Sequence, residues 1–525
     1  MLNGRRLGYL GIVVWIATIS PSFGQNSWVR QFGTSGDDFA LGVAYDAAYV
    51  YTAGYQNDTD FAPPNPCRTG AESLNVEAFL RKYTSGGTPA VGFSNTPAAT
   101  EIARATAVDG GGNVYVAGEN ILNGKAVLRK YASGGTLLWT TEFGAPLAPA
   151  IFFSVAVNAS GVYVAGHITN DPILNPTDTD VIVRAYDLAT GMTLLWSDEF
   201  GGSSLDSARG ISADSTGVYV VGYTGLTFPS SGSAEAFIRK YDLSGVVDWA
   251  DSFGAATGDD FAFSTAATGT SIYVAGYTPG LPAQTSLGLE DAFLRQYNLT
   301  GTPIWTREFG TSSADFAVGV AATSGAAYVI GYTGGQLPGQ VSLGQTDAYV
   351  SKYDPTGNEL WTTQFGTSGQ DGAWSVSANG NDVYVSGCTS GVFSGQSSVG
   401  GSDAFLLKNP YLSVAIDIKP GSDENTINLG SNGIVQVAIL STTTFDATTV
   451  DPTSVSLAGA SVKLKGNGTY QTSSQDLNGD GLLDLIVHVV TSALQLSDGD
   501  VAATLTGQTN AGQAIQGKDL VRIVP

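Results

Sequence analysis

Short runs of alternating hydrophobic and polar residues recur along most of the chain. Their period of two, together with their β-branched and aromatic residues, predicts short β-strands rather than helices. One run contains a glycine near its end and occurs seven times, as "YVYTAGY" (49–55), "NVYVAGE" (113–119), "GVYVAGH" (161–167), "GVYVVGY" (217–223), "SIYVAGY" (271–277), "AAYVIGY" (326–332) and "DVYVSGC" (382–388). A second run follows each of these, as "EAFLRKY" (77–83), "KAVLRKY" (125–131), "DVIVRAY" (180–186), "EAFIRKY" (235–241), "DAFLRQY" (291–297), "DAYVSKY" (347–353) and "DAFLLKN" (403–409).

Two further strands complete each repeated unit. A strand of small residues precedes the glycine-containing run, as in "ALGVAYD" (40–46), "ARGISAD" (208–214) and "AVGVAAT" (317–323). A tryptophan strand closes most units, as in "LWTTEFG", "LWSDEFG", "IWTREFG" and "LWTTQFG". Four short strands repeated every 48–64 residues or so predict the blades of a β-propeller. The small-residue strand is expected to be innermost, because strands crowd together near the central channel.

The first and last units predict how the ring closes. The seventh unit ends at residue 409 and has no tryptophan strand behind it, whereas residues 28–32 form such a strand with no unit in front. We expect residues 28–32 to pair with residues 403–408, because an open ring would leave two exposed sheet edges. One outer strand should be irregular, since Val91 stands where other units have Trp and Asn95 where they have Phe.

The pattern "VYVAGYT…G…DAFLRKY…G…W" resembles the SBBP repeat, a family of seven-bladed β-propellers in exported bacterial proteins, over residues 28–409. The resemblance implies the fold and not the function, because propellers host unrelated activities. The longer predicted loops fall on one face, where binding sites are common. They are residues 56–76, 168–179, 278–290 and 333–346, and the loop aromatics Phe61, Phe228 and Phe393 are suited to stacking on sugars.

After residue 410 the repeat gives way to a different set of alternating runs. They lie at residues 413–419, 434–440, 461–466, 482–490, 500–508 and 519–524, and they predict a small β-sandwich. The segments "IDIKPGS", "DLNGDGLLDL" and "LTGQT" resemble a C-terminal module of secreted bacterial proteins. The predicted fold is therefore all-β, with a leader (1–24), a seven-bladed β-propeller (25–409) and a C-terminal β-sandwich (410–525).

The loop "DLNGDGLLD" (476–484) predicts a calcium site. Hard oxygen ligands at positions 1, 3, 5 and 9, a carbonyl at position 7 and Gly481 at position 6 suit Ca²⁺. The predicted ligands are Asp476, Asn478, Asp480, Asp484 and the carbonyl of Leu482. Val487 replaces the final Glu of an EF-hand, and the loop resembles the D-x-D-x-D-G-x-x-D loops of integrin-type propellers. The alternative is an Asx-rich turn without metal.

An acidic residue stands just before six of the seven small-residue strands, and Ala150 takes that place in the other unit. The acidic residues are Asp38, Glu101, Asp206, Asp260, Asp315 and Asp371. On one interpretation each carboxylate accepts backbone N–H bonds in the turn that enters the strand. On the other, the six form a ring on the long-loop face that holds a cation or a polar ligand. The two interpretations are compatible.

The N-terminus and the cysteines indicate export. Arg5 and Arg6 precede an apolar run, and Ser22 and Gly24 follow it, which predicts a signal peptide cleaved after Gly24. The run is short for a membrane span, and no later segment is apolar enough to cross a bilayer. Cys67 and Cys388 fall in the first and seventh units, which are neighbours in the ring. We therefore expect a disulfide, with two separate thiols as the alternative.

Composition narrows the function. A net charge of −23 would repel phosphate backbones, so nucleic acid is not an expected partner. His167 and His488 are the only histidines, and both are interpreted as packing residues. The sequence contains no recognisable catalytic triad, zinc motif or phosphate loop, so no catalytic residue and no cofactor other than Ca²⁺ is nominated.

Three functions remain open. The favoured one is a secreted or cell-surface, monomeric, non-catalytic propeller that binds a glycan or an extracellular protein through its long-loop face. The second is a structural component of the envelope or matrix. The third is an enzyme, because "KYDPTGNELWTTQFG" (352–366) resembles the tryptophan-docking repeats of pyrroloquinoline quinone dehydrogenases. Alternatively, Asp206 or Asp371 would serve a polysaccharide lyase or hydrolase.

Overall fold

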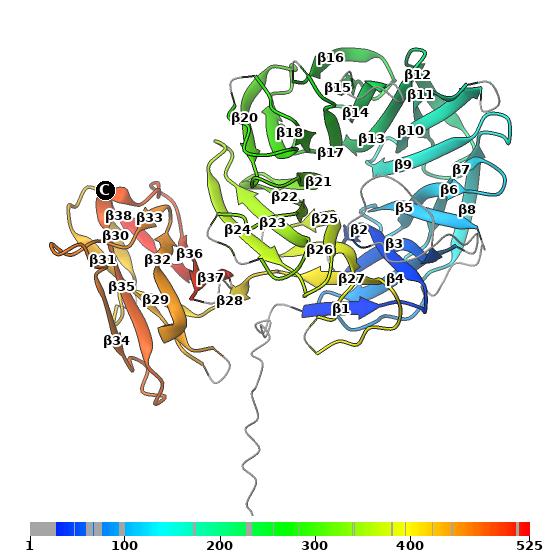
Figure 1. The fold of residues 1–525 in the computed structure, drawn as a ribbon. Helices are drawn as coiled ribbons and strands as arrows, with labels where there is room; N and C mark the ends of the chain where they lie inside the picture. Colours follow the sequence, from blue (N-terminus) through cyan, green and yellow to red (C-terminus); the bar gives the residue numbers. More distant parts are fainter. Residues whose placement is uncertain are drawn as a thin grey trace, which may run out of the picture.

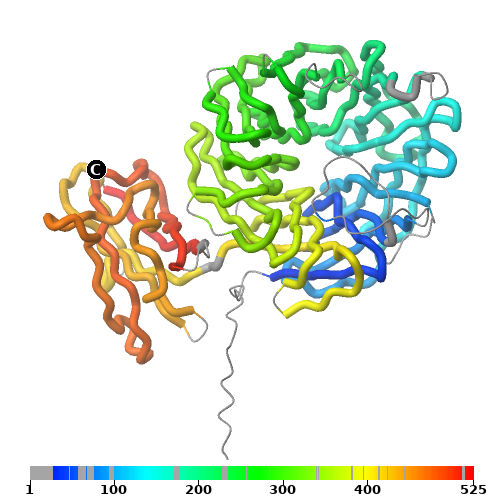
Figure 2. The backbone as a smooth tube through the Cα atoms, in the orientation of Figure 1, coloured from blue at the N-terminus to red at the C-terminus, as the bar shows by residue number. Residues whose placement is uncertain are grey.

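The computed structural model describes residues 28–524, except for residues 47, 59–66, 68–75, 94–99, 172–174, 227–233, 256, 283, 339, 341, 380–381, 394, 423, 443–444 and 511–513. The described strands form a ring of sheets with a second group of strands beside it (Figure 1). The chain runs round the ring in order and then enters the second group, as the colours of Figure 2 show. The predicted signal peptide lies outside the described residues.

The strands of the ring form seven blades, and in each blade the inner strand is given first. Blade 1 contains β2 (Asp37–Tyr45), β3 (Tyr49–Asp58) and β4 (Glu77–Thr84). Blade 2 contains β5 (Glu101–Val108), β6 (Val114–Asn120), β7 (Lys125–Tyr131) and β8 (Leu137–Phe143). Blade 3 contains β9 (Ala150–Val157), β10 (Val162–Asp171), β11 (Asn175–Tyr186) and β12 (Leu194–Phe200). Blade 4 contains β13 (Leu205–Ala213), β14 (Val218–Leu226), β15 (Glu235–Tyr241) and β16 (Val247–Phe253).

Blades 5 to 7 follow the same order. Blade 5 contains β17 (Phe261–Ala267), β18 (Ile272–Thr278), β19 (Asp291–Tyr297) and β20 (Pro303–Phe309). Blade 6 contains β21 (Asp315–Thr323), β22 (Ala326–Thr333), β23 (Asp347–Tyr353) and β24 (Glu359–Phe365). Blade 7 contains β25 (Asp371–Ala378), β26 (Val383–Thr389), β27 (Asp403–Lys408) and, as its outer strand, β1 (Trp28–Phe32). The predicted propeller fold is confirmed.

Blade 7 closes the ring with the first strand of the chain. β1 pairs antiparallel with β27, from Trp28 opposite Lys408 to Phe32 opposite Ala404. Figure 1 shows β1 beside β27 at the edge of the ring. The predicted closure is confirmed, and it removes the two free sheet edges that an open ring would expose.

Two segments of the ring bear on the sequence predictions. In blade 1 the described residues contain no fourth strand, and only an isolated bridge joins Tyr83 to Pro89, which confirms the predicted irregularity near Val91. In blade 3 the predicted loop 168–179 is wrong as a loop. β10 and β11 extend through most of it as a hairpin, with Ile168 opposite Asp180 and Thr169 opposite Thr179. The pairing gives the backbone of these polar residues its hydrogen-bond partners.

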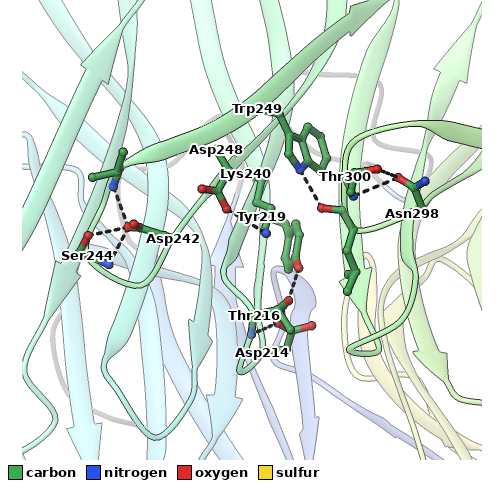
Figure 3. A network of polar contacts seen from close by, with 12 residues as sticks. Asp214, Thr216, Tyr219, Lys240, Asp242, Ser244, Asp248, Trp249, Asn298 and Thr300 are labelled. Atoms are coloured by element: carbon green, nitrogen blue, oxygen red, sulfur yellow. Dashed lines mark hydrogen bonds and ion pairs between the residues drawn. The ribbon is translucent and has the colours of Figure 1, made fainter.

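The repeated tryptophan bonds one blade to the next at four seams of the ring. Trp249 of blade 4 donates from Nε1 to the carbonyl oxygen of Leu299 in blade 5 at 3.0 Å, and Figure 3 shows this contact. Gly301 lies in the same turn with φ +83°, and a Cβ there would lie 2.6 Å from the indole ring. The indole therefore occupies the space that a side chain at Gly301 would need. Three other seams repeat the bond, from Trp28 to Ser85, Trp196 to Leu243 and Trp305 to Pro355.

The C-terminal strands form two main sheets around one core. The first contains β28 (Leu412–Ser413), β37 (Ala514–Leu520), β36 (Ala502–Thr509), β32 (Val450–Leu457) and β33 (Ala460–Ser461). The second contains β29 (Ile416–Ile418), β31 (Ile434–Ile439), β35 (Asp484–Val490) and β34 (Thr472–Gln475). β30 (Thr426–Asn428) pairs with β38 (Arg522–Val524), and two 3-10 turns are η1 (Ala447–Thr449) and η2 (Thr491–Ala493).

The core between these sheets has the composition of a sandwich. Val437 and Val487 of one sheet pack in the same buried cluster as Leu457 and Leu505 of the other. The predicted β-sandwich is confirmed. The sequence analysis does not predict β32, because its sequence "VDPTSVSL" contains a proline and few hydrophobic residues.

Candidate functional site

Every inner strand of the ring contains a β-bulge at the same place. In β13, Ala208 pairs with Gly222 and Gly210 pairs with Val221, so that Arg209 has no residue opposite it. A bulge redirects a side chain out of the regular alternation of a strand. The seven residues at this position, which we call the bulge ring, are Leu41, Arg104, Phe153, Arg209, Phe263, Val318 and Trp374.

The repeated glycine of the second strand makes the bulge sterically acceptable. At Gly222 a Cβ would lie 2.0 Å from the carbonyl oxygen of Ser207, which no side chain tolerates. The equivalent distance is 1.7 Å at both Gly166 and Gly331. An isolated glycine in a strand pattern is a known sign of a bulge or of close backbone approach. That signal is present in every "VYVAG" run, and it would have located the bulge ring, which the sequence analysis missed.

The residue type in the bulge ring differs among the blades, whereas the residue just before it is alanine in six blades and Phe152 in the other. Its seven side chains are all partly exposed, whereas the neighbouring alanines, such as Ala40 and Ala208, are buried. The inner strands face the centre of the ring (Figure 1). Adjacent blades bring these side chains into contact, since the guanidinium carbons of Arg104 and Arg209 lie 4.9 and 4.0 Å from the ring centroid of Phe153. The arrangement can present both aromatic faces and positive charge to a ligand.

His167 lies beside the bulge ring in an uncharged state. Its ring packs edge-to-face on Phe153 with centroids 5.3 Å apart, and its Nδ1 lies 3.1 Å from Oγ of Ser207. Burial, together with the positive charges of Arg209 and Arg104, lowers the pKa of His167 to about 3. The imidazole is therefore neutral at physiological pH.

The predicted acidic residues each serve a separate turn between blades. Their carboxylates are buried and accept the backbone N–H of a residue four or five positions earlier. Examples are Thr34 to Asp38 at 2.7 Å, Gly202 to Asp206 at 2.8 Å, Ala255 to Asp260 at 2.8 Å, Thr311 to Asp315 at 2.6 Å and Thr367 to Asp371 at 2.7 Å. Glu101 instead forms an ion pair with Arg129. This geometry supports the structural interpretation of these residues.

Within the described ranges, no three Asp, Glu, His or Cys side chains come together in a way that could hold a metal ion, and this includes the three aspartates of the loop 476–484. The acidic residues therefore do not form one cation site there. Asp206 also borders a cleft of about 480 Å³ at the seam of blades 3 and 4, together with Gly201, Gly225 and Arg239. Two backbone N–H groups, of Gly202 and Gly225, bind the Asp206 carboxylate in that cleft.

The disulfide lies next to the bulge ring. The structure joins Cys67 to Cys388 with a Cα–Cα distance of 6.0 Å, and both residues are fully buried. Trp374 donates from its indole nitrogen to the Cys388 sulfur at 3.3 Å. A disulfide is typical of proteins that fold in an oxidising environment outside the cytoplasm. No helix in the described part of the chain is long and apolar enough to span a bilayer.

The predicted loop aromatics do not form a binding surface among the described residues. Phe61 and Phe228 lie outside them. The prediction for Phe393 is wrong, because its side chain is only 5% exposed and packs edge-to-face on Phe405. The loop that contains Phe393 places this side chain against β27, which buries it.

The loop predicted to bind calcium leads into β35 with most of its side-chain oxygens on backbone amides. Asp476 accepts from the N–H groups of Gly479 and Gly481, and Asp480 accepts from that of Leu482. Asp484 is buried and accepts from Ser441 and Leu477. Gly481 has φ +87°, as the predicted tight turn requires. Asn478 donates from its side chain to Asp480 at 3.0 Å.

The fold defines the chain as a seven-bladed β-propeller followed by a β-sandwich. No protein-family model matches it, so the likeness to the SBBP repeat rests on the motifs alone. Among curated proteins, the regulatory protein FlaEY of Caulobacter vibrioides is 29% identical over 174 residues, which cover 30% of this chain and 18% of that protein. The matched region thus spans less than a fifth of FlaEY.

Solved structures with a similar arrangement have little sequence in common with the chain. Sqt1 from Chaetomium thermophilum is 11% identical with a TM-score of 0.40, over 73% of this chain and 99% of that one. Drosophila Plexin A, solved in complex with Semaphorin 1b, is 9% identical with a TM-score of 0.39, over 74% and 88%. The endosialidase of phage phi92 is 10% identical with a TM-score of 0.38, over 95% and 87%. Likenesses this distant carry no information on activity.

Proposed function

We propose that the chain is an exported, non-catalytic β-propeller that binds a glycan or an extracellular protein at the centre of its long-loop face. The observation that carries the proposal is the bulge ring. All seven inner strands contain the bulge, and the side chain that the bulge redirects differs in size and charge among the blades. In repeat proteins, the positions that differ between otherwise similar units commonly determine which ligand is bound.

The state of the titratable groups supports binding over catalysis. The carboxylates that an enzyme would use, those of Asp206 and Asp371, are buried and accept backbone N–H bonds. His167 is uncharged and packed against Phe153. By contrast, Phe153, Phe263 and Trp374 present partly exposed aromatic rings, which are suited to stacking on sugar rings. Of the two partner classes, these features favour a glycan.

The test is a glycan array probed with the mature chain, from Gln25 onward. We expect saturable binding to a restricted set of glycans, and Trp374→Ala or Phe153→Ala should weaken it roughly tenfold or more. Leu195→Ala is the matched control, because Leu195 is an exposed hydrophobic residue on an outer strand. A blank array would contradict glycan binding and leave an extracellular protein ligand or a structural role.

We also propose that the loop 476–484 binds Ca²⁺ and stabilises the C-terminal sandwich. The ligand spacing supports this, as does the positive φ of Gly479 and Gly481, which lets the loop curve around an ion. Calcium should raise the melting temperature of the sandwich in calorimetry of the full chain, and chelator should lower it. Asp480→Asn should abolish the difference between the two conditions.

Asp451→Asn is the matched control for calcium. Asp451 is in the same sandwich and also accepts hydrogen bonds from a nearby threonine, Thr453, but lies outside the motif. It should keep the response to calcium. Identical melting temperatures of the wild type with calcium and with chelator would show that the loop is an Asx-rich turn.

A further inference from the structure

Two arginines of the bulge ring contact the same phenylalanine ring. Arg104 belongs to blade 2, Phe153 to blade 3 and Arg209 to blade 4, and both guanidinium groups stack on the Phe153 ring. The cluster is continued by His167 against Phe153 and by Tyr223, whose hydroxyl accepts from Nη2 of Arg209 at 3.0 Å. Two guanidinium groups thus lie in the two blades that flank blade 3, in a chain whose net charge is −23.

The two arginines differ in how their charge is compensated. Arg104 forms an ion pair with Glu119 that uses both its Nε and its Nη2. Arg209 has no carboxylate within ion-pair distance among the described residues, and its Nε is buried without an acceptor. The Arg209 side chain is partly exposed and its charge is not compensated by a carboxylate of the described chain, so an anionic ligand group beside its exposed part would bind favourably.

The surroundings of Arg209 select the kind of anion. A planar guanidinium with free donors matches the two oxygens of a carboxylate. The aromatic rings of Phe153 and Phe263 lie partly exposed in the two blades that flank blade 4, and Phe263 stacks on Tyr277 with centroids 5.5 Å apart. Such rings suit the C–H face of a sugar. The chain's overall negative charge disfavours ligands with many negative charges.

We propose that Arg209 binds the carboxylate of an acidic sugar, a hexuronate unit of a glycan, whose ring lies against the aromatic residues of the bulge ring. This inference rests on the proposed glycan-binding function and specifies its ligand class.

The experiment compares two sugars that differ only in the carboxylate. Titration calorimetry of the mature full chain would use methyl glucuronide and methyl glucoside. We expect the glucuronide to bind roughly tenfold or more tightly, as a charge-assisted hydrogen bond implies. Arg209→Gln should reduce its affinity to that of the glucoside.

Arg295→Gln is the matched control, because Arg295 also has a buried Nε without an acceptor but lies on β19, away from the inner strands, and stacks on Phe253 of β16. It should bind like the wild type. Folding of Arg209→Gln is checked by NMR of His167, whose pKa should rise when the nearby cation is removed. Addition of glucuronide to the wild type should move the same His167 resonances.

The outcomes separate the inference from the function on which it rests. Equal affinities for the two sugars, or an Arg209→Gln variant that keeps the preference, would overturn the carboxylate assignment. Binding of neither sugar, with neutral glycans bound on the array, would overturn the assignment and leave glycan binding intact. Binding of neither sugar with a blank array would mean that the proposed function itself is wrong.

Discussion

The glycines that follow three of the closing phenylalanines each lie between two carboxylates from adjacent blades. A Cβ at Gly366 would lie 3.0 Å from Oδ1 of Asp347 and 2.6 Å from Oδ2 of Asp371. Asp347 accepts three hydrogen bonds through Oδ2, while its buried Oδ1 has none. The same pairing of third-strand and inner-strand carboxylates occurs at Gly33 and at Gly201. At the Gly366 site, burial and, to a smaller degree, the charge of Asp347 favour the protonated state of Asp371.

We therefore expect the stability of the propeller to fall as pH rises through the titration of Asp371. Burial, with a smaller contribution from Asp347, raises the pKa of Asp371 to about 6 from 3.8. A carboxyl group whose pKa is higher in the folded state than in the unfolded state stabilises the folded state while the pH is below the unfolded-state pKa. This contribution is lost as the pH rises through the folded-state pKa. Between pH 4 and pH 7 the wild type should lose about 2 kcal/mol more unfolding free energy than Asp371→Asn.

Denaturant unfolding at each pH measures this difference. The control is Asp242→Asn, because hydrogen bonds from the Ser244 side chain and the Val246 backbone lower the pKa of Asp242. The Asp242→Asn variant should therefore lose as much unfolding free energy with rising pH as the wild type does. A wild type and an Asp371→Asn variant with parallel pH profiles would show that Asp371 is ionised throughout.

At the scale of single residues, the sequence showed the acidic residue that recurs before the inner strands. It did not show the second carboxylate that lies close to it. The motif "DAFLRKY" contains the second carboxylate, yet nothing in one unit shows that it meets the acidic residue of the next unit. The contact forms only when two blades pack together. The contact of Arg104 and Arg209 with the Phe153 ring could not be predicted either, because its three residues belong to three different units.

At the scale of strands and turns, the seams between blades depend on close contact of an indole with a glycine. Gly245 has φ +91°, and a Cβ there would lie 2.6 Å from Cγ of Trp196. Gly245→Ala should therefore cost about 1–2 kcal/mol for the left-handed backbone and about 1–3 kcal/mol more for displacing the indole. Differential scanning calorimetry should show a lower melting temperature of the propeller.

Gly269→Ala is the matched control for that prediction. Gly269 also has a positive φ, +78°, but no atom lies within 4 Å of the place that a Cβ would occupy, so only the backbone cost applies. Equal destabilisation by the two substitutions would mean that the indole contact contributes nothing. Both glycines look alike in the sequence, and only the neighbouring blade distinguishes them.

Strands with strong alternation were predictable, and polar strands were not. The four-strand unit and the irregular outer strand near Val91 follow from periodicity and from the missing Trp. The hairpin over residues 168–179 was missed, because its Thr, Asn and Asp residues have the composition of a loop. Its two strands pair through backbone hydrogen bonds, and the pattern of side chains along the sequence does not predict such pairing.

At the scale of the whole molecule, two independent links hold the first and last units together. β1 pairs with β27, and the Cys67–Cys388 disulfide joins the loop after β3 to the end of β26. The order of the units predicted both links, since only neighbours in a closed ring bring residues so distant in sequence into contact. The central arrangement of the bulge ring depends on this closure, because it requires all seven inner strands.

The disulfide should stabilise the propeller by limiting its unfolded state. It closes a loop with a sequence separation of 321 residues. Chain entropy sets an upper limit of about 5–6 kcal/mol for such a loop, and measured gains are often about 2–4 kcal/mol. Cys67→Ser with Cys388→Ser should therefore lower the propeller's melting temperature in calorimetry. The melting temperature of the C-terminal sandwich should stay unchanged, because its core contains neither cysteine.

The sandwich is thus an internal control in the same experiment. Treatment of the wild type with reductant under denaturing conditions, followed by refolding with the thiols blocked, should reproduce the behaviour of the double variant. A propeller that melts at the wild-type temperature without its disulfide would mean that the β1–β27 pairing alone accounts for closure. Suppose instead that the double variant stays folded at the assay temperature and loses glucuronide binding. That result would mean that the disulfide mainly orders the ring centre, where Trp374 contacts Cys388.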